Sequence, residues 1–338
     1  MAGEGTISFE NNVVSRSTLE EKINRGEYLL IAGDEDVLAS LPSGNWIAGT
    51  IPYFMTEDGG KADQEQLYVT TISGVASHNP PRITLYDVNS ISRIATEAPE
   101  HGFTVLILPA SSDVHLAYAQ NAPDYPNMFF SPIVGWASGV HLDELDTKKP
   151  KVGFGPASGM LSDSQAVAMH IPISEQQVAN IKTVNLFSPD GGDSIRFKTK
   201  GFTVTDCVVN GEEVNFAQYI TDRKVDTRLP LVADYSGCMV NASVQEIIGS
   251  DVKMYAPVFP DFEYHFAKPV SDYVSEFDNA IPKGESDKVA FSYNCILNFL
   301  YSELDGKKTK GITGPITFGE IAYQLLNQTL VYLTLEDL

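Results

Sequence analysis

The sequence predicts a protein of mixed α and β structure, in which mixed β-sheets flanked by helices form two related or interlocked halves. Short apolar runs of strand length recur along the chain, and the clearest of them covers residues 103–109. Between the runs lie segments of helical spacing or with capping residues at their start, as helices have. The 26 glycines and 19 prolines provide the many turns that such a chain needs. A layered αββα arrangement fits this pattern.

The first part of the chain alternates strands with short helices. Residues 1–14 are interpreted as a polar arm, after which Ser17 caps a helix that ends at Gly26. Strands are expected at residues 28–32, 45–55, 67–73, 83–86, 103–109 and 131–139, and helices at residues 88–98 and 112–120. The nearly continuous apolar run at 103–109 predicts a central strand, buried on both faces.

Two of these strands are interrupted by a glycine close to a tryptophan. Gly49 follows Trp46, and Gly135 precedes Trp136. A glycine inside a strand allows a backbone or a ligand to approach closely. We therefore expect the two glycine-broken segments to face each other.

A charged, proline-containing stretch at residues 143–151 is the predicted boundary between an N-terminal half, residues 15–145, and a C-terminal half, residues 146–338. In the second half we expect strands at residues 167–173, 202–209, 229–243 and 254–266, and a helix that begins at Phe216. Asn210-Gly211 predicts a tight hairpin, and the prolines at 257 and 260 predict that the last of these strands lies at an edge.

The last fifty residues are unusually rich in aromatic, glycine and amide side chains for a chain end. They contain a predicted helix at residues 292–301, a glycine-punctuated turn at residues 311–321 and an apolar run at residues 329–335. Free chain ends are usually polar and poorly ordered. This end is therefore expected to be docked on the rest of the protein.

The charge of the chain argues against nucleic acids and anionic membranes as partners. It has 23 Lys and Arg against 44 Asp and Glu, a formal net charge of −21, which repels phosphate groups. Its dense basic runs, residues 148–151 and 307–310, are short and are interpreted as solvated loops. The acidic residues 34–36 are likewise interpreted as a solvated turn.

The cysteines and the N-terminus indicate a soluble cytoplasmic protein. The three cysteines, at positions 207, 238 and 295, are far apart and form no Cys-x-x-Cys pair, which favours a reducing compartment. The N-terminus lacks the pattern of a signal peptide, and no apolar run approaches the roughly 18 residues that span a membrane. The sequence leaves the oligomeric state open.

The closing block resembles the C-terminal half of the FIST sensory domain. That family has a Cys on a helix, a glycine-rich segment leading into Gly-Glu-Ile, and Asn-x-Thr before the final strand; the matching residues here are Cys295, Gly311, Gly314, Gly319-Glu320-Ile321 and Asn327-Gln328-Thr329. Residues 47–49, 132–135 and 202–205, with Asn210-Gly211, are similar to other strands of the family, so the resemblance covers nearly the whole chain. Where the family has an arginine shortly after the Cys, this chain has Ile296-Leu297-Asn298.

The resemblance implies an intracellular input module that binds a small molecule, with amino acids among the proposed ligands. It also implies that the signal passes to a separate effector protein, because no kinase, cyclic-dinucleotide enzyme or chemoreceptor part follows in this sequence. Some members of the family bind haem and sense nitric oxide. Haem is therefore an alternative ligand, and no other cofactor is expected.

Six residues are candidate ligand contacts: Glu320, Asn327, Asn294, Trp46, Tyr53 and Trp136. Glu320 follows a glycine where a helix is expected to begin, so its carboxylate either stabilises that helix or binds the ammonium group of a ligand. Asn327 either bridges a turn or contacts the ligand. The three aromatic side chains suit a small-ligand pocket, and core packing is the competing interpretation.

Three further residues belong to the alternative functions. Cys295 is the candidate nucleophile of a hydrolase that would use this thiol, or a serine, with a histidine; its apolar neighbours favour an inert core thiol. His170 and His265 lie in strand-like runs and are the candidate ligands of a haem iron. The competing interpretation is that each histidine is either hydrogen-bonded within the protein or exposed to solvent. A non-catalytic small-ligand sensor is thus the main hypothesis, with a hydrolase, a haem-based gas sensor and a protein-interaction module as alternatives.

Overall fold

The computed structural model describes residues 6–157, 159–235 and 237–338 and separates into two compact units. Unit 1 comprises the chain up to Thr183, Ile281–Leu325 and Leu330–Leu338, and unit 2 comprises Val184–Ala280 and Leu326–Thr329. Unit 2 is therefore inserted into the chain of unit 1. The boundary expected at residues 143–151 lies inside unit 1.

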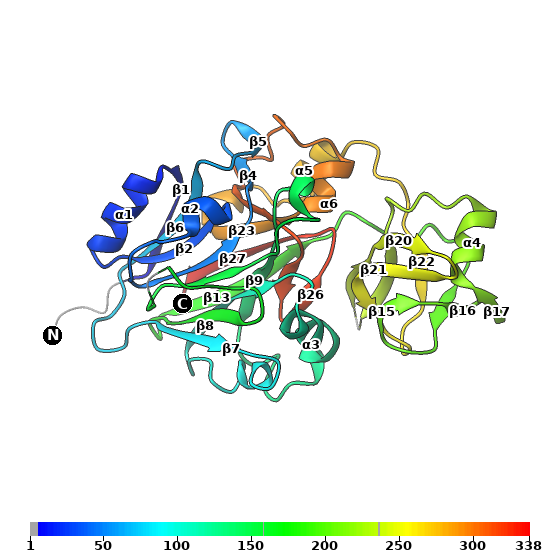
Figure 1. Cartoon of the computed structure of the whole chain (residues 1–338), viewed down its shortest axis with the longest axis horizontal. Coiled ribbons are helices and arrows are strands. Elements are labelled where there is room, and N and C mark those ends of the chain that lie inside the picture. Colours follow the sequence, from blue (N-terminus) through cyan, green and yellow to red (C-terminus); the bar gives the residue numbers. More distant parts are fainter. Residues whose placement is uncertain (1–5, 158, 236) are drawn as a thin grey trace. The chain divides into compact units, whose positions relative to one another are not determined.

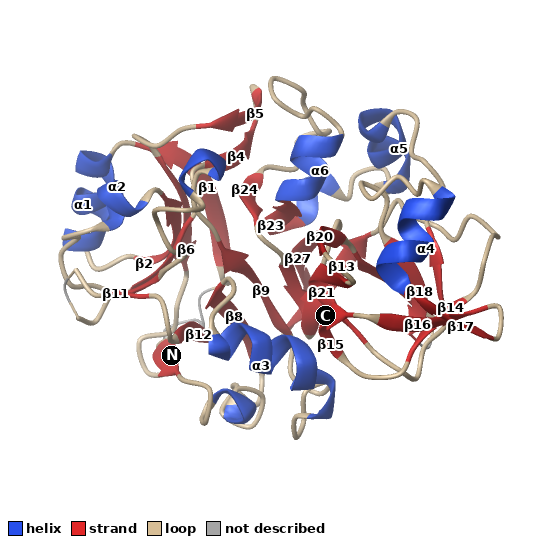
Figure 2. Ribbon diagram, turned by 45° about the vertical axis from the view of Figure 1, so that its right-hand side comes forward, coloured by secondary structure: helices blue, strands red, loops and turns tan. Residues whose placement is uncertain are grey.

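Unit 1 contains three six-stranded sheets (Figures 1 and 2). Sheet 1 has the order β1 (Ser8–Val14), β6 (Leu67–Ser73), β2 (Tyr28–Gly33), β3 (Trp46–Thr50), β10 (Val152–Phe154) and β11 (Leu161–Ser162). Sheet 2 has the order β7 (Arg82–Tyr86), β12 (Ala166–Pro172), β8 (Gly102–Pro109), β9 (Ile133–Ser138), β25 (Glu320–Ala322) and β26 (Gln324–Leu326). Sheet 3 has the order β13 (Gln177–Val184), β27 (Leu330–Asp337), β23 (Val289–Cys295), β24 (Gly314–Thr317), β4 (Tyr53–Thr56) and β5 (Gly59–Ala62).

The three sheets share one internal pattern. Each is built on a parallel pair of strands joined by a helix: β2 and β3 by α2 (Glu35–Leu38), β8 and β9 by α3 (Asp113–Asn121), and β23 and β24 by α6 (Ile296–Tyr301). An antiparallel strand pairs with the first strand of each parallel pair, namely β6, β12 and β27. Another antiparallel strand pairs with the second strand, namely β10, β25 and β4.

The strands that pair with the second strand, β4, β10 and β25, each lie in a different sheet from the strand that precedes it in the chain. After β3 the chain enters sheet 3 as β4, after β24 it enters sheet 2 as β25, and after β9 it enters sheet 1 as β10. Mixed sheets flanked by helices are thus confirmed. The repetition inside unit 1 is threefold, and this exchange of strands interlocks the three modules.

Local signals explain where most elements of unit 1 begin. The side chain of Ser15 accepts a hydrogen bond from Thr18 N and caps α1 (Arg16–Asn24), two residues before the expected cap. Ser112 caps α3 in the same way. Helix α1 covers sheet 1 through Leu19 and Ile23, which belong to an apolar cluster with Trp46. Residues 8–14 of the expected polar arm form β1, because they pair with β6 along its whole length.

The two glycine-broken segments do face each other, as expected. A Cβ atom on Gly49 would lie 2.3 Å from Cη2 of Trp136, so only glycine leaves room for this ring. The break in the first segment comes later than expected, however, at Ile51-Pro52. The run at 103–109 is confirmed as a central strand, since β8 lies between β9 and β12.

Two expected helices of unit 1 are wrong. Residues 88–98 form only the 3₁₀ turn η1 (Ile91–Arg93). Residues 292–295 belong to β23, and only the remainder of the predicted helix forms α6. Short apolar runs do not distinguish a buried strand from a helix, and β23 is buried on both faces at the centre of sheet 3. The other 3₁₀ turns are η2 (Ala122–Asp124), η3 (Leu142–Glu144) and η4 (Ser286–Lys288).

Unit 2 contains two sheets and two helices. Its six-stranded sheet has the order β17 (Glu212–Asn215), β16 (Asp206–Val209), β14 (Ile195–Phe197), β22 (Tyr264–Phe266), β18 (Leu231–Tyr235) and β19 (Cys238–Ala242). Its three-stranded sheet has the order β15 (Gly201–Val204), β21 (Asp251–Val258) and β20 (Val244–Ile248). The helices are α4 (Phe216–Arg223) and α5 (Tyr273–Ala280), and Phe216 of α4 packs on Phe197 and Phe266.

The hairpin expected at Asn210-Gly211 is confirmed. Both residues have positive φ, 50° and 92°, as a two-residue turn of this kind requires. The single strand expected at 202–209 is divided between two sheets, β15 and β16. The edge strand expected at 254–266 is also wrong, because β21 is the middle strand of its sheet and β22 is internal in the other.

Candidate functional site

A pocket of about 320 Å³ opens on unit 2 beside strands β14, β18, β19 and β22. This volume is within the range of small-molecule sites, roughly 300–1,000 Å³. The pocket combines apolar and charged side chains, and its lining consists of Pro189, Arg196, Val232, Asp234, Met239, Asp261, Phe262, Glu263 and His265.

The aromatic wall of the pocket is held rigidly. The ring of Phe262 lies flat on the ring of Tyr235, with centroids 3.6 Å apart and planes 8° apart. The hydroxyl of Tyr235 is hydrogen-bonded to that of Tyr264 at 2.7 Å, and Tyr264 in turn accepts a hydrogen bond from Phe259 N. A flat ligand group would therefore meet a preformed surface.

Glu263, Arg196 and His265 form a connected charged group in the pocket. Arg196 Nη2 lies 2.9 Å from Glu263 Oε2, and His265 Nε2 lies 3.4 Å from Glu263 Oε1. Hydrogen bonds from Ser194 and Arg196 hold the pKa of Glu263 below its usual range. His265 Nδ1 is 3.1 Å from the carbonyl oxygen of Asp193, which can only accept, so Nδ1 carries a hydrogen and Nε2 faces Glu263.

The run Asp261, Phe262, Glu263, Tyr264 and His265 builds most of the charged wall. Tyr264 is fully buried, whereas its two neighbours along the chain line the pocket. The sequence analysis selected only His265 from this run. Alternation on a strand accounts only for Glu263 and His265, which flank the buried Tyr264. Asp261 and Phe262 lie in the turn before β22, where no period-two pattern places their side chains.

The structure brings two of the predicted ligand contacts, Glu320 and Asn294, together in unit 1. With Thr317 they form a sealed polar cluster, which we define as Glu320, Thr317 and Asn294. Glu320 is paired with Trp136 across β25 and β9, so both side chains lie on the same face. Thr317 Oγ1 lies 3.3 Å from Glu320 Oε1 and 3.3 Å from Asn294 O. Glu320 is 0% exposed and Asn294 3%.

The expected helix start at Glu320 is wrong, because Glu320 begins strand β25. Gly319 has a φ of 148°, which favours glycine, and it lets the chain cross from β24 into sheet 2. The carboxylate is therefore enclosed by strands and does not cap a helix. A ligand ammonium has no open path to a side chain with no exposed surface.

Trp46, Tyr53 and Trp136 are core residues of unit 1, with exposures of 0%, 4% and 2%. The indole of Trp46 donates to Pro42 O at 2.9 Å. The hydroxyl of Tyr53 accepts a hydrogen bond from Leu142 N, and its ring stacks on His141. Core packing thus accounts for all three.

Asn327 belongs to unit 2, unlike the other five predicted ligand contacts. It is 2% exposed, and its carbonyl oxygen accepts a hydrogen bond from Asn241 Nδ2 at 3.0 Å. This bond uses the backbone of Asn327 and a side chain 86 positions away, so it is not the bridge across a turn that the sequence suggested for the Asn327 side chain.

Cys295 is 0% exposed at the junction of β23 and α6. Its backbone N–H donates to Asn294 Oδ1 at 2.8 Å. A nucleophile must reach its substrate, so this burial counts against Cys295 as a catalytic thiol. Cys238 is the exposed cysteine among the three.

His170 is buried in sheet 2 with a hydroxyl at each ring nitrogen. Nε2 lies 2.9 Å from Tyr86 Oη and Nδ1 lies 2.9 Å from Thr104 Oγ1. Burial lowers the pKa of His170 to about 3. Because both nitrogens are engaged, a haem iron would have to displace one of these hydrogen bonds.

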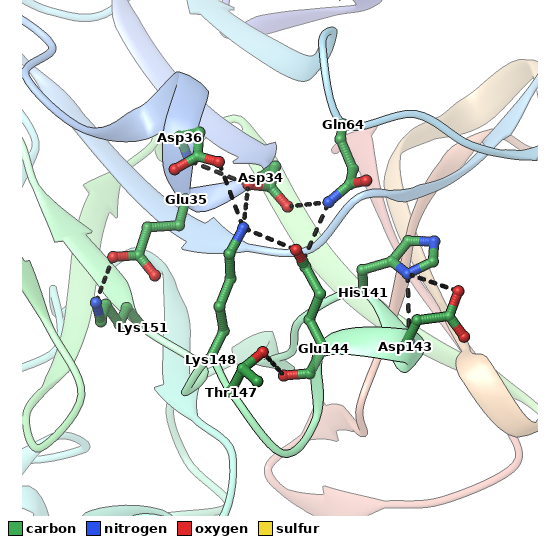
Figure 3. A network of polar contacts seen from close by, with 10 residues as sticks. All are labelled: Asp34, Glu35, Asp36, Gln64, His141, Asp143, Glu144, Thr147, Lys148 and Lys151. Atoms are coloured by element: carbon green, nitrogen blue, oxygen red, sulfur yellow. Dashed lines mark hydrogen bonds and ion pairs between the residues drawn. The ribbon is translucent and has the colours of Figure 1, made fainter.

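The acidic residues 34–36 and the lysines of the run 148–151 form an ion-pair network in unit 1, which Figure 3 shows. Lys148 Nζ lies 3.3 Å from Asp34, 3.4 Å from Asp36 and 3.2 Å from Glu144, and these carboxylates raise its pKa against the effect of burial. Lys151 pairs with Glu35. The expected solvated turn and loop are wrong here, since Asp34 is 3% exposed and caps α2.

Among the described residues, no group of three or more His, Cys, Asp and Glu side chains could hold a metal ion. No helix in the described part of the chain is long and apolar enough to cross a membrane.

A family model described as a family of unknown function, DUF6976, matches residues 14–336. None of the curated proteins and none of the solved structures matches the chain. The resemblance to the FIST domain stays a prediction. Because the matching residues cover nearly all of the sequence, the chain belongs to the DUF6976 family.

Proposed function

We propose that this protein is a sensory module that binds a small molecule in the pocket of unit 2 and has no catalytic activity of its own. The observation that carries the proposal is the pocket itself, which joins a preformed aromatic wall to charged side chains in about 320 Å³. Apolar surface with a few placed polar groups is the usual composition of a small-ligand site.

The lining favours a ligand that carries an amino group. Asp234, Asp261 and Glu263 contribute −3 and Arg196 contributes +1, so these four side chains have a net charge of −3 + 1 = −2. The charge of Arg196 is already opposed by Glu263. Asp234 and Asp261 therefore attract an ammonium group, and the ring of Phe262 adds a surface that cations favour. An amino acid, particularly a basic one, fits these contacts.

The sensory role rests on the resemblance to the FIST domain, whose members bind small molecules and act on effectors. We propose a cytoplasmic location and a separate effector protein on the same basis. The hydrolase and haem alternatives gain no support from Cys295 or His170, because both are buried in the core of unit 1.

A thermal-shift screen with amino acids and small amines tests the proposal. A ligand at 100 times its dissociation constant stabilises the folded state by about 2.7 kcal/mol, and we expect at least one amine to do so. The variant Asp261→Asn should lose most of this stabilisation. Glu212→Gln, which removes the same charge from the exposed β16–β17 hairpin, should keep it.

Two outcomes would count against the proposal. A panel that leaves the melting temperature unchanged removes its main support. A ligand that stabilises Asp261→Asn as strongly as the wild type binds somewhere other than this pocket.

A further inference from the structure

The chain makes a four-residue excursion into unit 2 near its end. It leaves unit 1 after Leu325, contributes Leu326–Thr329 to unit 2 and returns at Leu330. This segment, which we call the clasp, directly connects β26 to β27, two strands of unit 1. Asn327, Gln328 and Thr329 are 2%, 2% and 1% exposed, an unusual degree of burial for a polar loop.

Hydrogen bonds from unit 2 residues hold the clasp at both backbone and side chain. Asn241 Nδ2 lies 3.0 Å from Asn327 O and 3.3 Å from Gln328 O. Ser243 Oγ lies 2.5 Å from Gln328 Oε1, and Gln328 Nε2 donates to Arg228 O at 3.2 Å. Asn241 and Ser243 are themselves 0% exposed. The amide of Gln328 is thus bonded at its oxygen and at its nitrogen.

Gln328 has a left-handed backbone, with a φ of 49°. This conformation is uncommon outside glycine and costs of the order of 1 kcal/mol, so it persists only where surrounding contacts enforce it. Here the enforcing contacts are the two hydrogen bonds of the Gln328 amide. The clasp is therefore an element that changes conformation if these bonds are lost.

A second set of amide bonds joins the clasp to the pocket. Asn185 and Asn241 exchange two side-chain hydrogen bonds, of 2.9 and 3.0 Å. Asn185 Nδ2 also donates to the backbone oxygen of Met239 at 3.1 Å, and Met239 lines the pocket. Strand β19 thus carries a pocket residue and, two positions later, the residue that holds the clasp.

We propose that the clasp reports the state of the pocket to β26 and β27. This inference rests on the proposed function, because it takes the pocket to be the ligand site. A shift of β19 at Met239 moves the Asn185–Asn241 pair, and the carbonyl oxygens of the clasp then lose their donor. A buried carbonyl oxygen that loses its hydrogen-bond donor is destabilised, because no water replaces that donor. The conformation of the clasp therefore changes in a nearly all-or-none manner.

Hydrogen–deuterium exchange of the full chain, without any ligand, tests the relay. Asn241→Ala removes the two bonds to the carbonyl oxygens of the clasp and leaves those of the Gln328 amide, and we expect exchange in residues 326–330 to accelerate about tenfold or more. The informative variants are Asn185→Ala and the similarly sized Asn185→Asp, since Asn185 bonds to Met239, Asn241 and Phe187 N, and its bonds to Asn241 link it to the clasp. Both should accelerate exchange in residues 326–330 at least threefold. Gln218→Ala, which removes an exposed bond to Asp222 on α4, is the matched control and should change nothing there.

The relay is overturned if a folded Asn185 variant leaves exchange in residues 326–330 unchanged. It is also overturned if exchange rises equally in the β16–β17 hairpin, because a general loosening of unit 2 would then explain the result. If Asn185→Ala fails to fold, exchange in residues 326–330 of the Asn185→Asp variant tests the relay instead. Since no ligand is present, failure here is separate from failure of the thermal-shift screen.

Discussion

The pocket of unit 2 and the sealed polar cluster of unit 1 contain similar residue types in opposite surroundings. Both bring carboxylates next to large aromatic rings. In unit 1, Glu320 and Trp136 have almost no exposed surface, and neighbouring strands enclose them. In unit 2, Asp261 and Phe262 border an open volume. The comparison shows that a carboxylate beside an aromatic ring indicates a ligand site only where space remains for the ligand.

The largest expected effect is a loss of stability when a buried side chain beside the sealed polar cluster of unit 1 is truncated. Trp136→Ala should lower the free energy of unfolding by about 3–5 kcal/mol, because the ring fills the space beside Gly49 and packs on Tyr293. Phe130→Ala is the matched control, since Phe130 is 89% exposed and its truncation should cost less than about 0.5 kcal/mol. Denaturant unfolding measures both. Similar losses in the two variants would contradict the description of Trp136 as core.

The next largest effect is on the dependence of stability on pH. Burial lowers the pKa of His170 from 6.5 to about 3, so between these values the unfolded chain binds a proton that the native protein does not. Stability therefore falls as the pH drops below about 6.5, by up to about 1.4 kcal/mol per unit for this residue. His170→Gln should remove that slope from unfolding measurements between pH 6 and 5. An unchanged slope would mean that His170 is accessible to protons in the native state.

A smaller effect is expected from the ion-pair network. Lys148→Met leaves the carboxylates of Asp34 and Glu144 with Gln64 as their shared neutral partner and should cost about 1–2 kcal/mol. Lys149→Met removes only an exposed pair with Asp163 and should cost less than about 0.5 kcal/mol. Thermal unfolding of the two variants compares them directly. Equal stabilities of the Lys148 and Lys149 variants would show that the ion pair of the buried Asp34 stabilises the protein no more than an exposed pair does.

The smallest effect on stability is expected in the pocket itself. Asp261→Asn changes an exposed side chain and should alter the free energy of unfolding by less than about 0.5 kcal/mol. The same change should strongly weaken ligand binding. A large loss of stability would instead assign Asp261 a structural role and remove the contrast between the two regions.

Much of the local structure followed from the sequence. Strands β2, β6, β8 and β12, helix α3 and the Asn210-Gly211 turn were predictable because each depends on residues that are neighbours in the chain. The helix expected at residues 292–301 failed because its first residues are apolar for a tertiary reason: they form the central strand of a sheet. No local pattern reveals that β4, β10 and β25 are exchanged among three sheets.

The candidate site was predicted only in part. His265 was selected from its strand-like run, but Arg196, Asp234 and Asp261 come from separate segments whose approach depends on the fold. Glu320 and Asn294 were predicted to contact a ligand, yet sequence cannot report that no open space adjoins them. Asn327 was also predicted as a ligand contact; in the clasp it is buried and accepts a hydrogen bond at its backbone oxygen.

Isothermal titration calorimetry with the best stabilising amine tests the central assignment most directly. Asp261→Asn and Glu320→Gln each replace a carboxyl group by an amide, the first in the open pocket and the second in the sealed cluster. We expect the Asp261 variant to bind at least tenfold more weakly than the wild type, and the Glu320 variant to bind with wild-type affinity. Binding that is lost in Glu320→Gln and retained in Asp261→Asn would contradict the assignment of the ligand site to unit 2.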